Sequence, residues 1–287
     1  MKYASVVFML SVVISMGSAW AEGPQSLGTD SLKSLQRIAF QSKCASHSWK
    51  HGRGLAPRSY IEGVALVFAR AVCHPDRSDT QIVSAPMSRK SDANDALAVY
   101  EQKFAAAGMI NDKAGVDTLR HSYTLLIGLG MMESSGKYCE GRDVSQCFAG
   151  ADDAEAGLFQ TSYGAHIHSL VLDNLFKAYK SDQNQCLLNI FHDSLTCRIV
   201  KSHNPKCPSA TSDVAGTGDG ADWQRLTKDC PAFATEYGAV VLRTNGGRHG
   251  EFNPIRKQQA ELRPECDSML QSVQSFVGHN PEICSAL

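Results

Sequence analysis

The stretch DTLRHSYTLLIGLGMM, residues 117–132, decides the fold, because its apolar side chains fall on more than one stripe of a helix. A helix that is apolar nearly all round is a buried helix. Gly128 and Gly130 would each cost about 1 kcal/mol relative to alanine in a helix, so we expect them to let another element approach the backbone closely. The sequence therefore predicts a central, buried helix from Asp117 to about Met132.

Helical periodicity continues over most of the remaining chain. A capping box of Ser59 and Glu62 predicts one helix start, and Ser91 predicts another, whose helix Gly108 would end. Further helices are expected over residues 167–179, 186–191, 223–241 with an interruption at Pro231, from Asn253 to a break or kink at Pro264, and around 269–276. The best strand candidate is Gly157–Tyr163.

These elements predict a fold that is mainly α with a small β element. The simplest organisation is a single domain over residues 22–287. The Ser-, Thr- and Gly-rich stretch 209–220 is expected to be an exposed loop and is the only plausible linker, which leaves a two-lobed arrangement open.

The first 21 residues have the pattern of an export signal. Lys2 supplies the positive start, residues 6–16 are apolar, and Ala19-Trp20-Ala21 is a small-x-small cleavage pattern. The apolar run is shorter than the roughly 20 residues that span a bilayer, so we expect cleavage after Ala21 rather than an anchor. The sequence predicts a secreted or periplasmic protein with no stable membrane insertion.

Composition narrows the possible partners. The 28 Lys and Arg residues and 29 Asp and Glu residues give a formal charge of −1, which offers nothing to attract a nucleic-acid backbone. The same balance gives little long-range attraction towards an acidic polymer. The sequence does not predict an oligomeric state.

All ten cysteines lie beyond the expected cleavage point, and an even number in an oxidising compartment predicts up to five disulfides. Their connectivity is open, although a Cys139–Cys147 bridge would close a short ring after residue 136. Cysteine pairs with zinc-ligand spacing are absent from the sequence, and a two-residue separation of His166 and His168 is not a metal motif. No metal or other cofactor is therefore predicted.

The chemistry is expected where the buried helix ends, in Gly130-Met131-Met132-Glu133-Ser134-Ser135-Gly136. A carboxyl group in such a desolvated place has a raised pKa, as a general acid near neutral pH requires. About twenty residues later comes Ala156-Gly157-Leu158-Phe159-Gln160. We expect this strand to place backbone groups and a side-chain amide beside Glu133.

Glu-Ser-Ser-Gly after an apolar helix, then a polar loop, then Gly-Leu-Phe-Gln, resembles the core motif of the lysozyme-like superfamily, in particular goose-type lysozymes and soluble lytic transglycosylases. The resemblance covers roughly residues 117–163. It implies a two-lobed helical domain with a cleft for β-1,4-linked amino sugars. It also implies that Glu133 is the catalytic acid and that Ser134, Gly157, Leu158, Phe159, Gln160 and Tyr163 belong to the substrate-binding wall.

A second catalytic group depends on the mechanism. Hydrolases of this kind use a second carboxylate, whereas lytic transglycosylases of the superfamily generally use one glutamate and the sugar's own 6-hydroxyl. The polar loop offers Glu140, Asp143, Asp152, Asp153 and Glu155. We rank Asp143 and Asp153 highest, because the loop is expected to fold back over the cleft.

The sequence departs from the family pattern after the motif. A Tyr-Asn-x-Gly segment is not evident, and its nearest analogue, at Tyr237, would line the cleft from a later helix or belong to the core. Residues 243–256 contain several polar side chains in a glycine-containing turn, which would form a saccharide or anion subsite or a solvated turn.

Two interpretations follow. The first is a secreted or periplasmic glycoside hydrolase or lytic transglycosylase with a polysaccharide substrate, peptidoglycan by default, although chitin, chitosan or another glucan stays open. The second is an exported domain without catalytic activity that binds glycan or protein through a lysozyme-like cleft. A disulfide-rich structural protein is a third, weaker interpretation.

Overall fold

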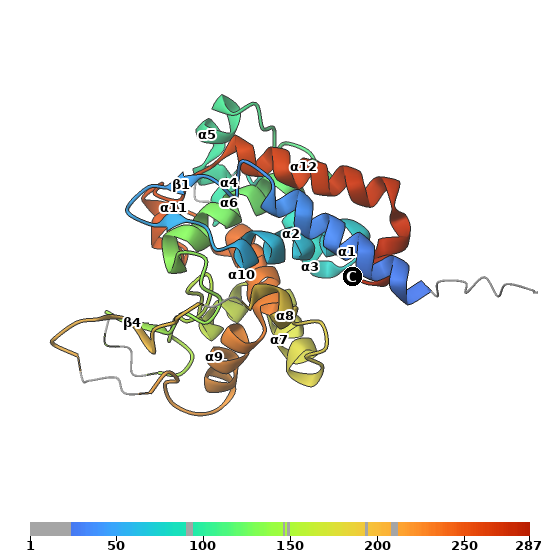
Figure 1. Cartoon of the computed structure of the whole chain (residues 1–287). Coiled ribbons are helices and arrows are strands. Elements are labelled where there is room, and N and C mark those ends of the chain that lie inside the picture. The colour runs from blue at the N-terminus through green and yellow to red at the C-terminus, as the bar shows by residue number, and fades with distance from the viewer. Residues whose placement is uncertain (1–23, 90–93, 146, 148–149, 193–194, 208–211) are drawn as a thin grey trace, which may run out of the picture.

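A computed structural model describes residues 24–89, 94–145, 147, 150–192, 195–207 and 212–287 (Figure 1). The predicted export signal and Ser91 lie outside these residues. In chain order the helices are α1 (Pro24–Phe40), α2 (Arg58–Cys73), α3 (Ser78–Val83), α4 (Ala96–Val99), α5 (Glu101–Ala106), α6 (Val116–Ser134), η1 (Tyr163–His168), α7 (Leu170–Ser181), α8 (Leu188–Phe191), α9 (Asp219–Asp229), α10 (Pro231–Thr244), α11 (Asn253–Arg256), α12 (Pro264–His279) and η2 (Pro281–Ser285). The strands are β1 (Ser48–Trp49), β2 (Gly54–Leu55), β3 (Arg142–Val144) and β4 (Val200–His203).

The predicted central helix is confirmed as α6. It packs against α2, α3, α10, α11 and α12, and nearly all of its residues are buried. A Cβ at Gly128 would overlap the backbone carbonyl of Glu261, and one at Gly130 would overlap the Tyr60 hydroxyl. The two glycines therefore allow the close approach that the sequence predicted.

The other helices surround α6 and α10. Figure 1 shows α1 and α12 on one side of α10 and α7, α8 and α9 on the other. Both α1 and α12 contact α2, whereas α10 contacts α7 and α9. Among the described residues, no helix combines the length and apolar character needed to cross a bilayer.

The β structure is small and differs from the prediction. β1 and β2 are antiparallel, and β3 and β4 are parallel, with Arg142 opposite Val200 and a register shift before Asp143. The prediction of a strand over Gly157–Tyr163 is wrong. Residues 157–160 form a tight turn closed by an isolated antiparallel bridge between Ala156 and Thr161, because positive φ at Gly157 and Gln160 reverses the chain.

Two predicted helix boundaries are also wrong. Ser59 does not cap α2, because the helix follows Pro57 and begins at Arg58, which leaves Ser59 buried inside it. Pro264 does not break a helix but begins α12, since the first turn needs no N–H donor at that position. The class predicted from the sequence, mainly α with a small β element, is confirmed.

All ten cysteines form disulfides: Cys44–Cys266, Cys73–Cys284, Cys139–Cys197, Cys147–Cys207 and Cys186–Cys230. The predicted Cys139–Cys147 bridge is wrong, because β3 and β4 lie side by side and each cysteine near β3 meets one near β4. Such a set of disulfides is typical of proteins that fold in an oxidising environment.

Candidate functional site

Glu133 lies in the last turn of α6. Ser135 and Gly136 both adopt positive φ directly after it, which ends the helix. The residue is only 8% exposed, and Nζ of Lys201, on β4, lies 2.8 Å from its Oε2. Burial raises the pKa of the Glu133 carboxyl, while the positive charges of Lys201 and Arg53 oppose that rise. The sequence correctly predicted a buried carboxyl here with a raised pKa, but not its cationic partner.

The β3–β4 pair brings charged side chains to the end of α6. Asp143 lies on β3 and faces Ser202, the residue after Lys201, in the register. Its negative charge contributes to the raised pKa of Glu133. The backbone N–H of Asp143 donates to the carbonyl of Glu155 at 3.1 Å, which fixes the next acidic segment against β3.

The turn at residues 157–160 is held by its own polar groups. Nε2 of Gln160 donates to the carbonyls of Gly141, at 3.0 Å, and Gly157, at 2.9 Å. Gly157 adopts φ +77° and lies so close to Thr227 that a side chain would not fit. The Gln160 amide therefore holds the turn against the segment before β3, rather than facing a substrate.

Glu155 and Glu251 complete the charged cluster. Burial raises the pKa of Glu155 to about 8, and the charges of Glu251, Glu133 and Asp143 add to the effect. Burial likewise raises the pKa of Glu251 to about 7, and Glu133 adds to it. The backbone N–H of Ser162 donates to Oε1 of Glu251. Four carboxyl groups from separate parts of the chain thus act on one another electrostatically.

A cavity of about 440 Å³ opens beside this cluster. Its acidic lining consists of Asp153, Glu155 and Glu251. Asn94, Asn245, His168 and His249 supply further polar groups. Glu133 does not belong to the lining, although its charge acts on both Glu155 and Glu251.

Several residues predicted to bind substrate are buried in the structure. Ser134, Leu158, Phe159 and Tyr237 are each at most 2% exposed. Oγ of Ser134 donates to the Gly130 carbonyl, and the Tyr237 hydroxyl donates to the carbonyl of Ser162. A substrate at the protein surface does not reach these side chains, so they pack beneath the site and do not bind the substrate directly.

Of the remaining predictions, Asp153 is exposed and lines the cavity, and Tyr163 is partly exposed at the start of η1. Glu140 is fully buried and paired with Arg198. Arg243 is also buried and binds Asp95, so it does not belong to a subsite in the 243–256 segment. Glu251 does come from that segment. The one feature of the sequence that pointed to Glu251 was its position in a polar, glycine-containing turn.

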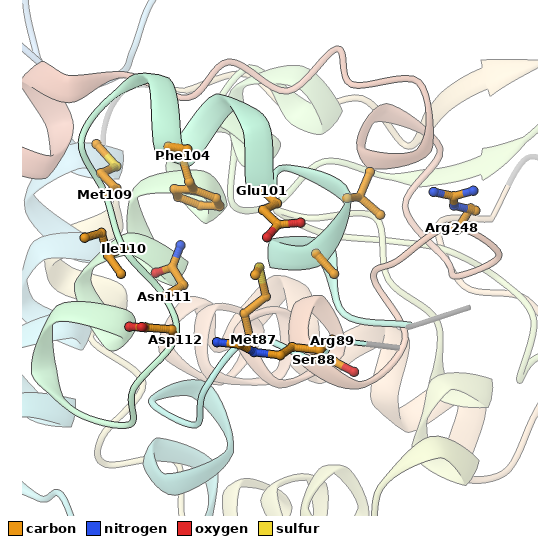
Figure 2. A pocket seen from close by; sticks show the side chains of 13 residues that line it. Met87, Ser88, Arg89, Glu101, Phe104, Met109, Ile110, Asn111, Asp112 and Arg248 are labelled. Atoms are coloured by element: carbon orange, nitrogen blue, oxygen red, sulfur yellow. The ribbon is translucent and has the colours of Figure 1, made fainter. Parts of the chain in front are cut away.

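Another cavity, of about 480 Å³, lies between α5 and the segment after α3 (Figure 2). Met87 and Phe104 point into it, and Glu101 and Asp112 lie at its border. Of the residues singled out from the sequence, its lining includes Arg248, from the 243–256 segment. Outside the undescribed segments, no group of three or more His, Cys, Asp or Glu residues is placed to hold a metal ion.

The carboxyl groups of this cluster can transfer protons. A buried carboxyl with a raised pKa can donate a proton near neutral pH, and neighbouring carboxyls provide acceptors. Comparisons of the chain with protein-family models, with curated proteins and with solved structures find no match. The function is therefore inferred from the cluster itself.

Proposed function

We propose that this chain is a secreted or periplasmic enzyme that cleaves β-1,4-linked amino-sugar polymers, with Glu133 as the general acid. The observation that supports the proposal most strongly is the position of the Glu133 carboxyl, which is buried at the end of α6 within electrostatic reach of three further carboxyls. The adjacent cavity supplies polar groups at the surface. The resemblance of residues 117–163 to lysozyme-like enzymes points to the same chemistry.

In this proposal, Glu133 donates its proton to the glycosidic oxygen as the bond to the leaving sugar breaks. Burial favours the protonated form, and Lys201 favours the ionised form that remains after transfer. The sugar left behind then reacts with water or with its own 6-hydroxyl. Asp143 and Glu155 are candidates for a base in the hydrolytic route, because each interacts electrostatically with Glu133.

A second function is favoured by two specific observations. The 2.8 Å ion pair with Lys201 stabilises the ionised form of Glu133, and the residue does not line the cavity. Both features suit an exported domain that binds glycan or a protein partner without cleaving it. The two functions differ in whether soluble fragments are released.

The deciding experiment incubates the purified protein with peptidoglycan, chitin and chitosan and analyses soluble products by mass spectrometry. Glu133→Gln is expected to reduce product release by about 10²- to 10⁴-fold, because it removes the proton donor while keeping the shape. Glu282→Gln, an exposed acid on η2, is the matched control and should retain activity.

Circular dichroism should show that both variants remain folded. A mass 18 Da below that of the hydrolysed product, from loss of one water, would identify an anhydro end and so a lytic transglycosylase. Equal product release by Glu133→Gln would contradict the catalytic assignment. Retention on a polymer without any release would support the binding domain instead.

A further inference from the structure

The cavity beside Glu133 has an unbalanced charge. Asp153, Glu155 and Glu251 line it, whereas no lysine or arginine occurs among the described residues of its lining. Lys201, the cation of the cluster, is paired with Glu133 and lies outside the lining. The surface that a ligand meets is therefore acidic, even though the whole chain has a formal charge of only −1.

Glu155 differs from the other carboxyls in having no partner of its own. Its side chain has no hydrogen bond or ion pair to any described residue, although it is more than half buried. Glu251, in contrast, accepts a hydrogen bond from the backbone of Ser162. A buried carboxyl without a cation keeps its proton to higher pH, and a ligand that supplies a positive charge stabilises its ionised form.

The helix η1 borders the cavity and carries an aromatic pair outside its lining. Tyr163 and His166 stack with their ring centroids 4.3 Å apart and their planes 20° from parallel. The same helix contributes Gly164, Ala165 and His168 to the cavity lining. Ile167 on η1 and Leu170 at the start of α7 are 75% and 83% exposed.

We propose that this cavity binds a sugar unit with a free, protonated amino group, so that the preferred polymer is at least partly deacetylated. This inference rests on the proposed function and defines its substrate class. The ammonium group would lie between Glu155 and Glu251 and supply the cation that neither carboxyl has within the protein. An acetylated unit brings no charge there, and an acidic polymer gains no favourable charge interaction with these carboxyls.

The test measures binding by calorimetry in the Glu133→Gln background, which prevents cleavage. The probes are the hexamer of β-1,4-linked glucosamine and the hexamer of N-acetylglucosamine. We expect the glucosamine hexamer to bind at least about tenfold more tightly, which is the effect of one favourable charge interaction of about 1.4 kcal/mol. The preference should weaken as salt concentration rises.

Glu155→Gln and Glu251→Gln, each added to this background, should reduce binding of the glucosamine hexamer by about three- to tenfold and leave the acetylated hexamer unaffected. Glu282→Gln removes the same charge from an exposed position and should leave both affinities unchanged. Thermal unfolding of each variant separates loss of charge from loss of structure. In particular, glutamine at 251 keeps an oxygen that can accept the Ser162 hydrogen bond.

Equal or tighter binding of the acetylated hexamer would overturn the inference. So would unchanged glucosamine binding in both cavity variants. If the protein with Glu133 intact still cleaves an acetylated polymer, the proposed function survives while the substrate class fails. If no polymer is cleaved and neither hexamer binds, both fail.

Discussion

The helical body around α6 and the acidic segment from Arg142 to Ser162 are stabilised in different ways. The helical body buries apolar side chains from α2, α6, α10 and α12 against one another. The acidic segment contains the short strand β3 and a turn with positive φ, and the Arg198–Glu140 ion pair and two disulfides lie near it. The comparison indicates that the proposed chemistry lies where the apolar helical body meets a segment held by hydrogen bonds and nearby disulfides as well as by its buried Leu158 and Phe159.

The largest effect is expected from removing the disulfide nearest the site. Replacing Cys139 and Cys197 with serine opens a bridge across 58 residues, and the expected loss is about 2–4 kcal/mol in the free energy of unfolding. Because the bridge joins the segments before β3 and β4, polysaccharide cleavage should fall while the helical circular dichroism stays nearly intact. Limited proteolysis should cut the acidic segment first.

The matched control replaces Cys73 and Cys284, which join α2 to η2 in the helical body. This double variant should lower the melting temperature without lowering cleavage activity at temperatures where it is folded. Equal loss of activity in the two double variants would mean that the two regions do not differ in the way described.

A somewhat smaller effect is expected inside the helical body. Gly128→Ala places a methyl group against the Glu261 carbonyl, which should lower the free energy of unfolding by about 3 kcal/mol. Gly278→Ala, on α12, meets no atom within 4 Å and should instead add about 0.5–1 kcal/mol. Chemical denaturation measures both. An unchanged free energy of unfolding in Gly128→Ala would mean that α6 is not packed closely at this point.

The acidic segment should also make stability depend on pH. The pKa values of Glu155, about 8, and Glu251, about 7, exceed the ordinary value of 4.5 in the unfolded chain. The folded state therefore binds these two protons more tightly than the unfolded chain does. The resulting contribution to the free energy of unfolding is full below pH 4.5 and decreases as pH rises towards 8.

Glu155→Gln should remove part of this decrease, on the order of 1 kcal/mol at pH 8, because the carboxyl is partly exposed and screened. Glu282→Gln serves as the control, and thermal unfolding between pH 4 and pH 8 is the measurement. Stability that does not fall over this range, or that falls equally in both variants, would contradict the raised pKa values.

The sequence predicted the helical body better than the acidic segment, for a physical reason. Apolar periodicity over residues 117–132 follows directly from helix geometry, so α6 and the role of Gly128 could be found. The turn at 157–160 looked like a strand, because its buried Leu158 and Phe159 have the composition of one.

The site was predicted only in part. Glu133 was identified by its place at the end of an apolar helix, whereas Lys201 and Glu251 are 68 and 118 residues away in sequence. Their contact with the cluster depends on the β3–β4 pairing and on the loop after α10. No local pattern encodes such long-range contacts, and the disulfide connectivity was open for the same reason.

The most direct test of the central claim, that the Glu133 carboxyl is the proton donor, is the pH profile of kcat/KM for polysaccharide cleavage. Lys201→Met removes the charge that lowers the pKa of Glu133, so activity should persist to higher pH than in the unchanged protein. Lys180→Met, whose lysine pairs with Asp219 and Asp222 on α9, should leave the profile unchanged. A profile that Lys201→Met does not move, or full activity in Glu133→Gln, would contradict the account.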